Sequence, residues 1–250
     1  MDYLIFSSHK TGTQTLVSTL KLNGFESAHC HVIPKNGRPN ELGFRKGRFI
    51  EYLDSYRQTN GNKLKIITVF RAPIERHVSS FFQWHGSKPL RNKDVDRKSE
   101  TIIFQFGLEE LQRKLISELS DQSLVGYRES LHVISDEIGI PLNRMNLSKE
   151  SDHFVHESEY LKLHIFHFDT LFSDLRHKLE LLLGCKIQLK SNNQSEKKWY
   201  SEIYNDFKST LRLPNDVISD VYSSKKDIVE MLFDKNYSSI LRDAIRKHGN

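Results

Sequence analysis

Apolar and polar positions alternate along the chain in blocks that switch between the periods of a strand and of a helix. An apolar run at residues 3–6 is followed by a polar turn and then by apolar residues at helical spacing over 16–22. Residues 64–70 are rich in β-branched side chains, and 161–168 alternate apolar and polar positions, so both segments are predicted strands, as is 26–33. Strands that alternate with helices predict an α/β fold with a central, mostly parallel sheet covered by helices on both faces.

Helical periodicity predicts most of the remaining elements. Helices are expected at 49–56, at 106–138 with an interruption at Gly126, at 171–183 closed by Gly184, and at 199–208, 216–233 and 237–247. The charged segment 87–100 is predicted to be a mobile loop, and 191–198 a polar loop. No internal repeat or low-complexity segment occurs, so we expect a single domain over residues 1–250 with a helical C-terminal part from about residue 199.

Composition limits the class of protein. Hydrophobic residues make up 37% of the chain and charged residues 28%, which is typical of globular proteins. The sequence has no apolar run of about 18 residues and no secretion-signal pattern, so no transmembrane segment is expected. These features predict a cytoplasmic protein, while peripheral contact with the inner membrane surface, the loss of an anchor and the oligomeric state stay open.

Charge and cysteine content narrow the expected ligands. A formal net charge of +5 suits an anionic ligand, but no nucleic-acid-binding motif accompanies it, so no nucleic acid partner is expected. Cys30 and Cys185 are the only cysteines and support no disulfide framework. No Cys/His group has zinc-ligand spacing, and no carboxylate pair has the context of a metal site, so the sequence predicts no metal.

The turn after the first predicted strand has the composition of an anion-binding loop. It leads into a predicted helix and reads Ser7-Ser8-His9-Lys10-Thr11-Gly12-Thr13-Gln14-Thr15. Backbone N–H groups and the helix dipole favour an anion at such a position. Lys10 adds a full charge, Gly12 lets the backbone approach closely, and the Thr hydroxyls can donate hydrogen bonds. The Walker A order GxxxxGK[ST] does not fit, because Lys10 precedes Gly12 and the first Gly is missing.

A second motif follows the predicted strand 64–70 and reads Arg71-Ala72-Pro73-Ile74-Glu75-Arg76-His77-Val78-Ser79. Arg71 leaves the carboxyl end of the strand, where ligands of open α/β sheets collect, and a guanidinium can bind phosphate through two parallel hydrogen bonds. Ser79 lies two turns into the next predicted helix and is expected to face the same ligand. Arg76 is expected to have a structural role.

These motifs resemble those of sulfotransferases that use 3′-phosphoadenosine-5′-phosphosulfate (PAPS). The loop is similar to K-[ST]-G-T-[ST], and the second motif to R-[DN]-P-x-x-R-x-x-S, with Ala72 as a departure. Phe168-Asp169-Thr170-Leu171 is similar to the y-E-D-L segment of the superfamily. Lys197-Lys198-Trp199-Tyr200-Ser201 resembles the N-K-W-Y-S motif of a family of bacterial capsular-polysaccharide synthesis proteins, with Lys197 in place of Asn.

The resemblance implies a three-layer P-loop-like sulfotransferase fold and the transfer of a sulfuryl group from PAPS to a carbohydrate hydroxyl. The acceptor would be a capsular polysaccharide or glycolipid precursor. PAPS would be converted to adenosine 3′,5′-bisphosphate. Arg71 and Ser79 would bind the 3′-phosphate, Lys198 would reach it, and Trp199 or Tyr200 would either pack near the adenine or anchor the core. The full set of donor-binding residues implied is Lys10, Thr11, Gly12, Thr13, Gln14, Thr15, Arg71, Ser79 and Lys198.

Sulfuryl transfer from PAPS to a hydroxyl is favoured by a cation near the leaving group and a general base near the acceptor. Lys10 would neutralise the charge that develops on the bridging oxygen in a loose transition state. His29 and His31 lie on one face of the predicted strand 26–33 and are the preferred general bases, as an H-x-H occurs at this place in several glycan sulfotransferases. His31 is favoured because it lies nearer the carboxyl end of the strand. A purely structural or surface His pair, and His9, Glu51 or Glu75 as the base, stay open.

Two other functions are compatible with the sequence. A P-loop-like nucleotide kinase would share the fold, although the Walker A order and a Mg²⁺-binding pair are absent from the sequence. A non-catalytic nucleotide or polyanion binder would share the loop without turnover. The acceptor pocket is expected in segments 34–47 and 87–100, whose Lys and Arg content permits an acidic glycan.

Overall fold

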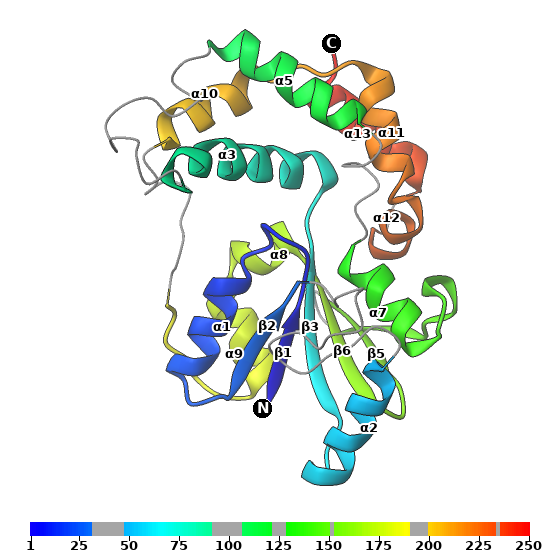
Figure 1. The fold of residues 1–250 in the computed structure, drawn as a ribbon. Coiled ribbons are helices and arrows are strands. Elements are labelled where there is room, and N and C mark those ends of the chain that lie inside the picture. The colour runs from blue at the N-terminus through cyan, green and yellow to red at the C-terminus, as the bar shows by residue number, and fades with distance from the viewer. Residues whose placement is uncertain (32–47, 92–106, 122–128, 151–152, 191–199, 234–235) are drawn as a thin grey trace. The chain divides into compact units, whose positions relative to one another are not determined.

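The computed structural model describes two compact units (Figure 1). The described residues are 1–31, 48–91, 107–121, 129–150, 153–190, 200–233 and 236–250. The sheet unit comprises Met1–Arg71 and Arg128–Asn192, and the helical unit comprises Ala72–Tyr127 and Asn193–Asn250. The predicted acceptor segment 34–47 lies outside the described residues.

The described residues of the sheet unit form a six-stranded, mostly parallel sheet in the order β2-β1-β3-β6-β5-β4. Strands β2, β1, β3 and β6 run parallel, whereas β5 and β4 are antiparallel and form the far edge. The strands are β1 (Tyr3–Phe6), β2 (Ser27–Cys30), β3 (Leu64–Phe70), β4 (Leu147–Glu150), β5 (His153–Glu157) and β6 (Leu161–His167). The predicted α/β class with a mostly parallel, helix-flanked sheet is confirmed.

Helices cover both faces of this sheet (Figure 1). On one face, Ile5 and Ile67 pack in a core with Leu16 and Leu20 of α1. On the other face, the ring of Phe6 meets that of Phe49 in α2 at 6.0 Å. Successive strand residues point to opposite faces, so a strand covered on both faces is apolar on both, as β1 is at all of its positions. The first face carries α1 (Thr13–Leu22), α8 (Phe168–Ser173) and α9 (Leu175–Leu183), and the second α2 (Phe49–Asn60) and α7 (Ser130–Ile138).

The structure corrects several predicted elements of the sheet unit. The strand predicted at 26–33 ends at Cys30, so His31 lies one residue beyond it. The helix predicted at 171–183 is two helices separated by Asp174, whose carboxylate accepts a hydrogen bond from the backbone N–H of His177 at 3.4 Å. An Asp at a helix start competes well with helix continuation, because it satisfies an otherwise unpaired donor. Gly184 closes α9 as expected.

The helical unit has its own aromatic core. Phe82 meets Phe207 at 5.1 Å and Tyr204 at 5.2 Å between ring centroids, and Phe81 stacks on Phe207 at 6.1 Å. Tyr200 is buried beside Phe82, so it anchors this core. The helices are α3 (Pro73–Arg91), α5 (Leu108–Ser120), α10 (Ser201–Thr210), α11 (Asn215–Ser223), α12 (Lys226–Leu232) and α13 (Tyr237–His248).

Three long predicted segments divide differently in the structure. The helix predicted at 216–233 is two helices, α11 and α12, separated by Ser224 and Lys225. Helix α3 continues to Arg91, so the loop predicted at 87–100 is wrong over its first five residues, and the rest lies outside the described residues. The helix predicted at 106–138 is instead α5 and α7, which belong to different units, and Gly126 lies outside the described residues. Apolar periodicity alone does not show that a chain has left one core for another.

Candidate active site

The strand order identifies where a ligand of the sheet unit would bind. From β1 the chain crosses one face through α1 to β2, and then crosses the other face through α2 to β3, on the opposite side of β1. Ligands of open parallel sheets bind outside the carboxyl ends of the strands, where the chain reverses in this way. That position lies between β1 and β3, and the segments that leave these strands there are 7–12 and Arg71.

A chain of hydrogen bonds holds the loop after β1 against β3. The backbone N–H of Val69 donates to the Ser7 hydroxyl at 3.0 Å, and the hydroxyl oxygens of Ser7 and Thr11 lie 2.7 Å apart. The Thr11 hydroxyl donates to the carbonyl oxygen of Ser8 at 2.7 Å. Both side chains are fully buried. The Thr11 hydroxyl therefore shapes the loop, and any contact of Thr11 with a ligand falls to its backbone N–H.

Gly12 is required at the start of α1 for two reasons. Its φ is 75°, in the left-handed region that side chains disfavour. A Cβ atom at this position would also lie 2.1 Å from the ring of Phe172, which packs directly against the main chain. The Gly of the loop is thus fixed by backbone geometry and by an aromatic residue 160 positions away (172 minus 12). No local pattern predicts the second contact.

The N-terminus of α1 is suited to an anion. Gly12 provides no side-chain cap, and the first turn carries no acidic residue. The first backbone N–H groups of a helix lack partners within the helix, so they attract a negative group together with the helix dipole. Of the predicted ligands in this turn, Gln14 is exposed and Thr15 half-buried, whereas Thr13 is buried.

Lys10 and Arg71 are joined across the position between β1 and β3. Nη1 of Arg71 donates to the carbonyl oxygen of Lys10 at 3.0 Å, and the guanidinium carbon lies 4.4 Å from the ring centroid of Phe168. Lys10 itself has a φ of 68°, which is unusual for a residue with a side chain. Arg71 therefore braces the main chain of Lys10 in a strained conformation, a role that the sequence did not indicate.

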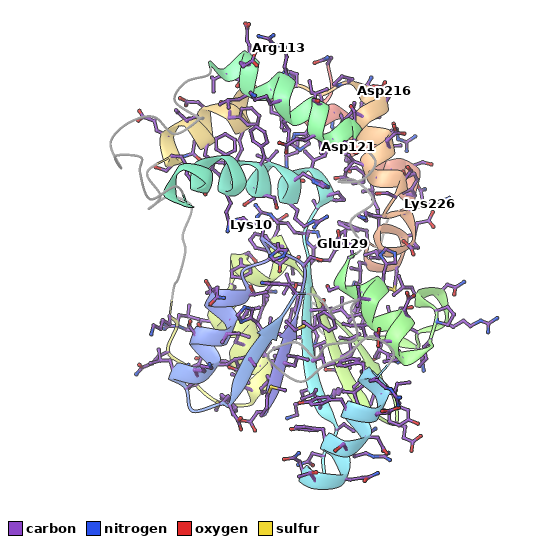
Figure 2. All side chains as sticks on the ribbon, in the orientation of Figure 1. Lys10, Arg113, Asp121, Glu129, Asp216 and Lys226 are labelled. Carbon is purple, nitrogen blue, oxygen red and sulfur yellow. The ribbon has the colours of Figure 1, made fainter. Side chains whose placement is uncertain are left out.

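Glu129 supports the loop from the start of α7. Its Oε2 accepts a hydrogen bond from the Ser8 hydroxyl at 2.7 Å, and the backbone N–H of Ser130 donates to the same hydroxyl at 3.1 Å. Glu129 is buried. Figure 2 shows Glu129 and Lys10 at the end of the sheet where β1 and β3 terminate. Sequence reasoning missed Glu129, because 121 residues separate it from Ser8.

Three histidines gather beside the loop. The rings of His9 and His31 lie 4.2 Å apart, and those of His29 and His31 lie 5.1 Å apart, between centroids. Nδ1 of His31 lies 2.6 Å from the carbonyl oxygen of Ser7, and Nε2 of His29 lies 3.3 Å from Nε2 of Gln14. The structure thus brings both predicted bases, and the alternative His9, to the loop that carries Lys10.

The hydrogen bonds of these histidines define their tautomers. A carbonyl oxygen can only accept, so Nδ1 of His31 carries a proton and Nε2 is the accepting nitrogen of the neutral ring. The amide nitrogen of Gln14 can only donate, so Nε2 of His29 is already used as an acceptor. The contacts favour His31 over His29 as a proton acceptor.

The carboxylates considered as alternative bases are engaged elsewhere. Glu75, in α3 of the helical unit, contacts Lys247 and lies 3.2 Å from Nε2 of His248. Burial raises the pKa of Glu75, but hydrogen bonds and charge from His248 and Lys247 outweigh it and hold the pKa at about 2. Such a carboxylate accepts protons poorly at neutral pH. Glu51 is paired with Arg48.

The remaining predicted ligand residues, Ser79 and Lys198, are not among the described residues of the sheet unit. Ser79 is a buried residue of α3, in the helical unit, and Arg76 is buried in the same helix. The structural role of Arg76 stays a prediction. Lys198 lies outside the described residues. Binding of the 3′-phosphate by Ser79 and Lys198 stays a prediction.

Comparisons of the chain with protein-family models, curated proteins and solved structures find no match. Among the described residues, no helix has the length and apolar character needed to cross a membrane.

Since no relative is found, the site is interpreted from its own chemistry. It combines backbone donors at a helix start, the cations Lys10 and Arg71, and the imidazole of His31, which together suit the binding of an anionic ligand.

Proposed function

We propose that the chain is a PAPS-dependent sulfotransferase that sulfates a hydroxyl of a carbohydrate, such as a capsular polysaccharide or glycolipid precursor. The observation that carries the proposal is the contact between Arg71 and the carbonyl of Lys10, at the chain reversal between β1 and β3. It joins the two sequence motifs that resemble the sulfotransferase signature. The three-layer P-loop-like sulfotransferase fold is part of the same proposal.

The loop supplies positive charge where the donor would be cleaved. PAPS provides an activated sulfuryl group, bonded through oxygen to the 5′-phosphate of a nucleotide. The N–H groups at the start of α1 would bind that phosphate, and Lys10 would neutralise the oxygen from which sulfur departs. A loose transition state needs mainly positioning and charge stabilisation, which these groups provide without a metal.

His31 supplies the base for the acceptor. The acceptor oxygen forms a bond to sulfur as the bond from sulfur to the bridging oxygen breaks, and the hydroxyl proton passes to Nε2 of His31. The products are a sulfate ester and adenosine 3′,5′-bisphosphate, so atoms and charge balance. The hydrogen bond from Nδ1 to Ser7 orients the ring and stabilises the imidazolium that results.

Binding measurements separate this proposal from the kinase alternative. Calorimetry should show binding of adenosine 3′,5′-bisphosphate in the presence of EDTA, and weaker binding of 5′-AMP, which lacks the 3′-phosphate. Binding of ATP that requires Mg²⁺, with no affinity for the bisphosphate, would instead support a kinase.

Activity is tested with ³⁵S-labelled PAPS and a panel of neutral and acidic glycans. Transfer of label to a glycan supports the proposal, and comparison of the two groups shows whether an acidic acceptor is preferred. Bisphosphate binding with no transfer to any glycan, or to any other hydroxyl acceptor, would identify a non-catalytic binder.

A further inference from the structure

Two histidines and a glutamate meet on one face of the sheet at its antiparallel edge. Glu150 of β4 stands opposite His153 of β5, and His153 stands opposite Phe166 of β6. His164 lies two residues before Phe166, so it projects from the same face and is the diagonal neighbour of His153. The three side chains come from three different strands, which is why their sequence spacing resembles no metal motif.

The ligand atoms of this group lie close to the spacing of a metal site. Nε2 of His153 is 3.1 Å from Nδ1 of His164 and 3.9 Å from Oε2 of Glu150, and all three ligand atoms lie within 4.8 Å of one another. Ligands of tetrahedral zinc, with bonds of about 2.0–2.1 Å, lie about 3.3 Å apart. Rotation of the Glu150 side chain can bring its carboxylate oxygen closer to the two imidazole nitrogens. Among the described residues, no other group of three His, Cys, Asp or Glu side chains meets this closely.

Packing holds the two imidazoles in place and leaves the carboxylate at the solvent side. The His153 ring stacks on Phe166 at 4.4 Å with an interplanar angle of 12°, and His164 is buried. Glu150 keeps half of its side chain exposed. The arrangement offers two imidazole nitrogens fixed by packing and one carboxylate oxygen that can adjust its position.

Both imidazoles are available in the neutral form that binds metals. Burial, with a smaller effect of neighbouring charges, lowers the pKa of His164 to about 3, and burial lowers the pKa of His153. In the contact between the rings one nitrogen donates to the other. Each ring has a second nitrogen that can carry its proton, so metal binding requires a change of tautomer and no net loss of a proton.

We propose that Glu150, His153 and His164 bind a divalent metal ion of the Zn²⁺ class. Two imidazole nitrogens and one carboxylate oxygen are a donor set that such ions favour, with water completing the coordination. The ion would tie the edge hairpin β4–β5 to the central strand β6. A competing charge is that of Lys162, whose Nζ lies 4.0 Å from Oε1 of Glu150 and would be displaced on binding. The proposal is independent of the sulfotransferase function.

Cobalt provides a direct readout of the site. Protein treated with EDTA and then titrated with Co²⁺ should develop the visible absorption of a low-coordinate cobalt site, at one ion per chain, and Zn²⁺ should abolish it. The melting temperature should rise by about 3–6 °C when free Zn²⁺ is tenfold above its Kd. Absence of the cobalt spectrum, with no thermal shift, would overturn the proposal.

Matched variants localise the site without disturbing the core. Glu150→Gln changes a half-exposed side chain and should weaken metal binding at least about tenfold. Glu157→Gln is the control, because Glu157 is about as exposed as Glu150 and lies on the same face of β5 as His153. The Glu157 carboxylate pairs with Lys63 at 2.9 Å. His31→Gln tests whether the histidines near the donor loop bind the ion instead. Equal affinity in wild type and Glu150→Gln, or loss of binding in His31→Gln, would contradict the assignment.

Discussion

Nη1 of Arg71 donates a hydrogen bond of 3.0 Å to the main-chain carbonyl of Lys10, two residues before Gly12, the residue that caps α1. The contact places a second positive charge directly behind the loop and holds Lys10 at a positive φ. An arginine suits this position because its planar fork can donate to the carbonyl while other N–H groups face a ligand. Replacement of Arg71 should therefore affect loop geometry and ligand binding together.

Arg71→Lys and Arg71→Ala should both weaken binding of adenosine 3′,5′-bisphosphate, by about 10- to 100-fold, because either change removes charge-assisted hydrogen bonds. Calorimetry measures the effect. Arg144→Ala, which removes an exposed arginine of the same unit, is the control and should bind normally. If Arg71→Lys binds as tightly as wild type, then charge alone is sufficient and the bracing role is wrong.

Lys10→Ala should reduce turnover about 100- to 1000-fold, because the leaving oxygen loses a preorganised cation. Bisphosphate affinity should change much less, since the N–H groups of α1 and Arg71 are still present. The comparison uses initial rates with labelled PAPS beside calorimetry. Lys21→Ala, at the far end of α1, provides the matched control. Unchanged turnover in Lys10→Ala would remove the catalytic assignment of Lys10.

Gly12→Ala should destabilise the protein by about 2–4 kcal/mol, through the cost of a positive φ and the collision with Phe172. Gly61→Ala separates the two causes, because Gly61 has a φ of 69° and a Cβ added there would meet no atom within 4 Å. It should cost only about 1 kcal/mol. Denaturant unfolding measures both. Equal losses would show that the Phe172 contact contributes nothing.

His31→Gln should reduce turnover about 100- to 10,000-fold, the range expected when a general base is removed. The decline in rate on the acid side of the pH profile, where the base becomes protonated, should also disappear. His29→Gln should have a smaller effect, because the Nε2 of His29 faces Gln14. The exposed His177 on α9 serves as the control site. A larger loss in His29→Gln than in His31→Gln would reverse the assignment.

Glu75 should make the stability of the helical unit depend on acid pH. Its pKa is held at about 2, below the ordinary value of 4.5, so its stabilising contacts are complete above pH 4.5. They are lost as the pH falls through 2, and the difference corresponds to about 3 kcal/mol. Denaturant unfolding of wild type and Glu75→Gln should therefore differ at pH 7 and converge near pH 2. Glu230→Gln, at an exposed pair with Lys226, should show no such convergence.

The elements that sequence predicted well are those with a strong local pattern. Strands β1 and β3 coincide with the predicted runs, because helices cover both faces of the sheet and most positions of these strands are therefore apolar, with Lys65 and Thr68 as the polar residues of β3. The hairpin β4–β5 was missed, since β4 reads Leu-Ser-Lys-Glu and is mostly exposed. An edge strand of this kind carries too few apolar residues to differ from a loop.

The candidate site shows the same division. Lys10, Gly12 and Arg71 were found because loops and strand ends have short, recognisable motifs. Their supporting contacts with Phe172 and Glu129 arise from residues more than 100 positions away and leave no local signal. The preference for His31 over His29 also depends on which atoms their ring nitrogens face, and alternation along a strand contains no such information.

The way in which the chain alternates between units constrains the order of folding during synthesis. Strand β6 pairs with β3 at the centre of the sheet, yet the ribosome makes the whole segment Ala72–Tyr127 between them. In the nascent chain, the edge of β3 that pairs with β6 therefore has no strand partner until residue 167 has left the ribosome. Expression of the first 71 residues alone should yield an aggregating fragment, whereas co-expression with residues 128–192 offers the missing strands in trans.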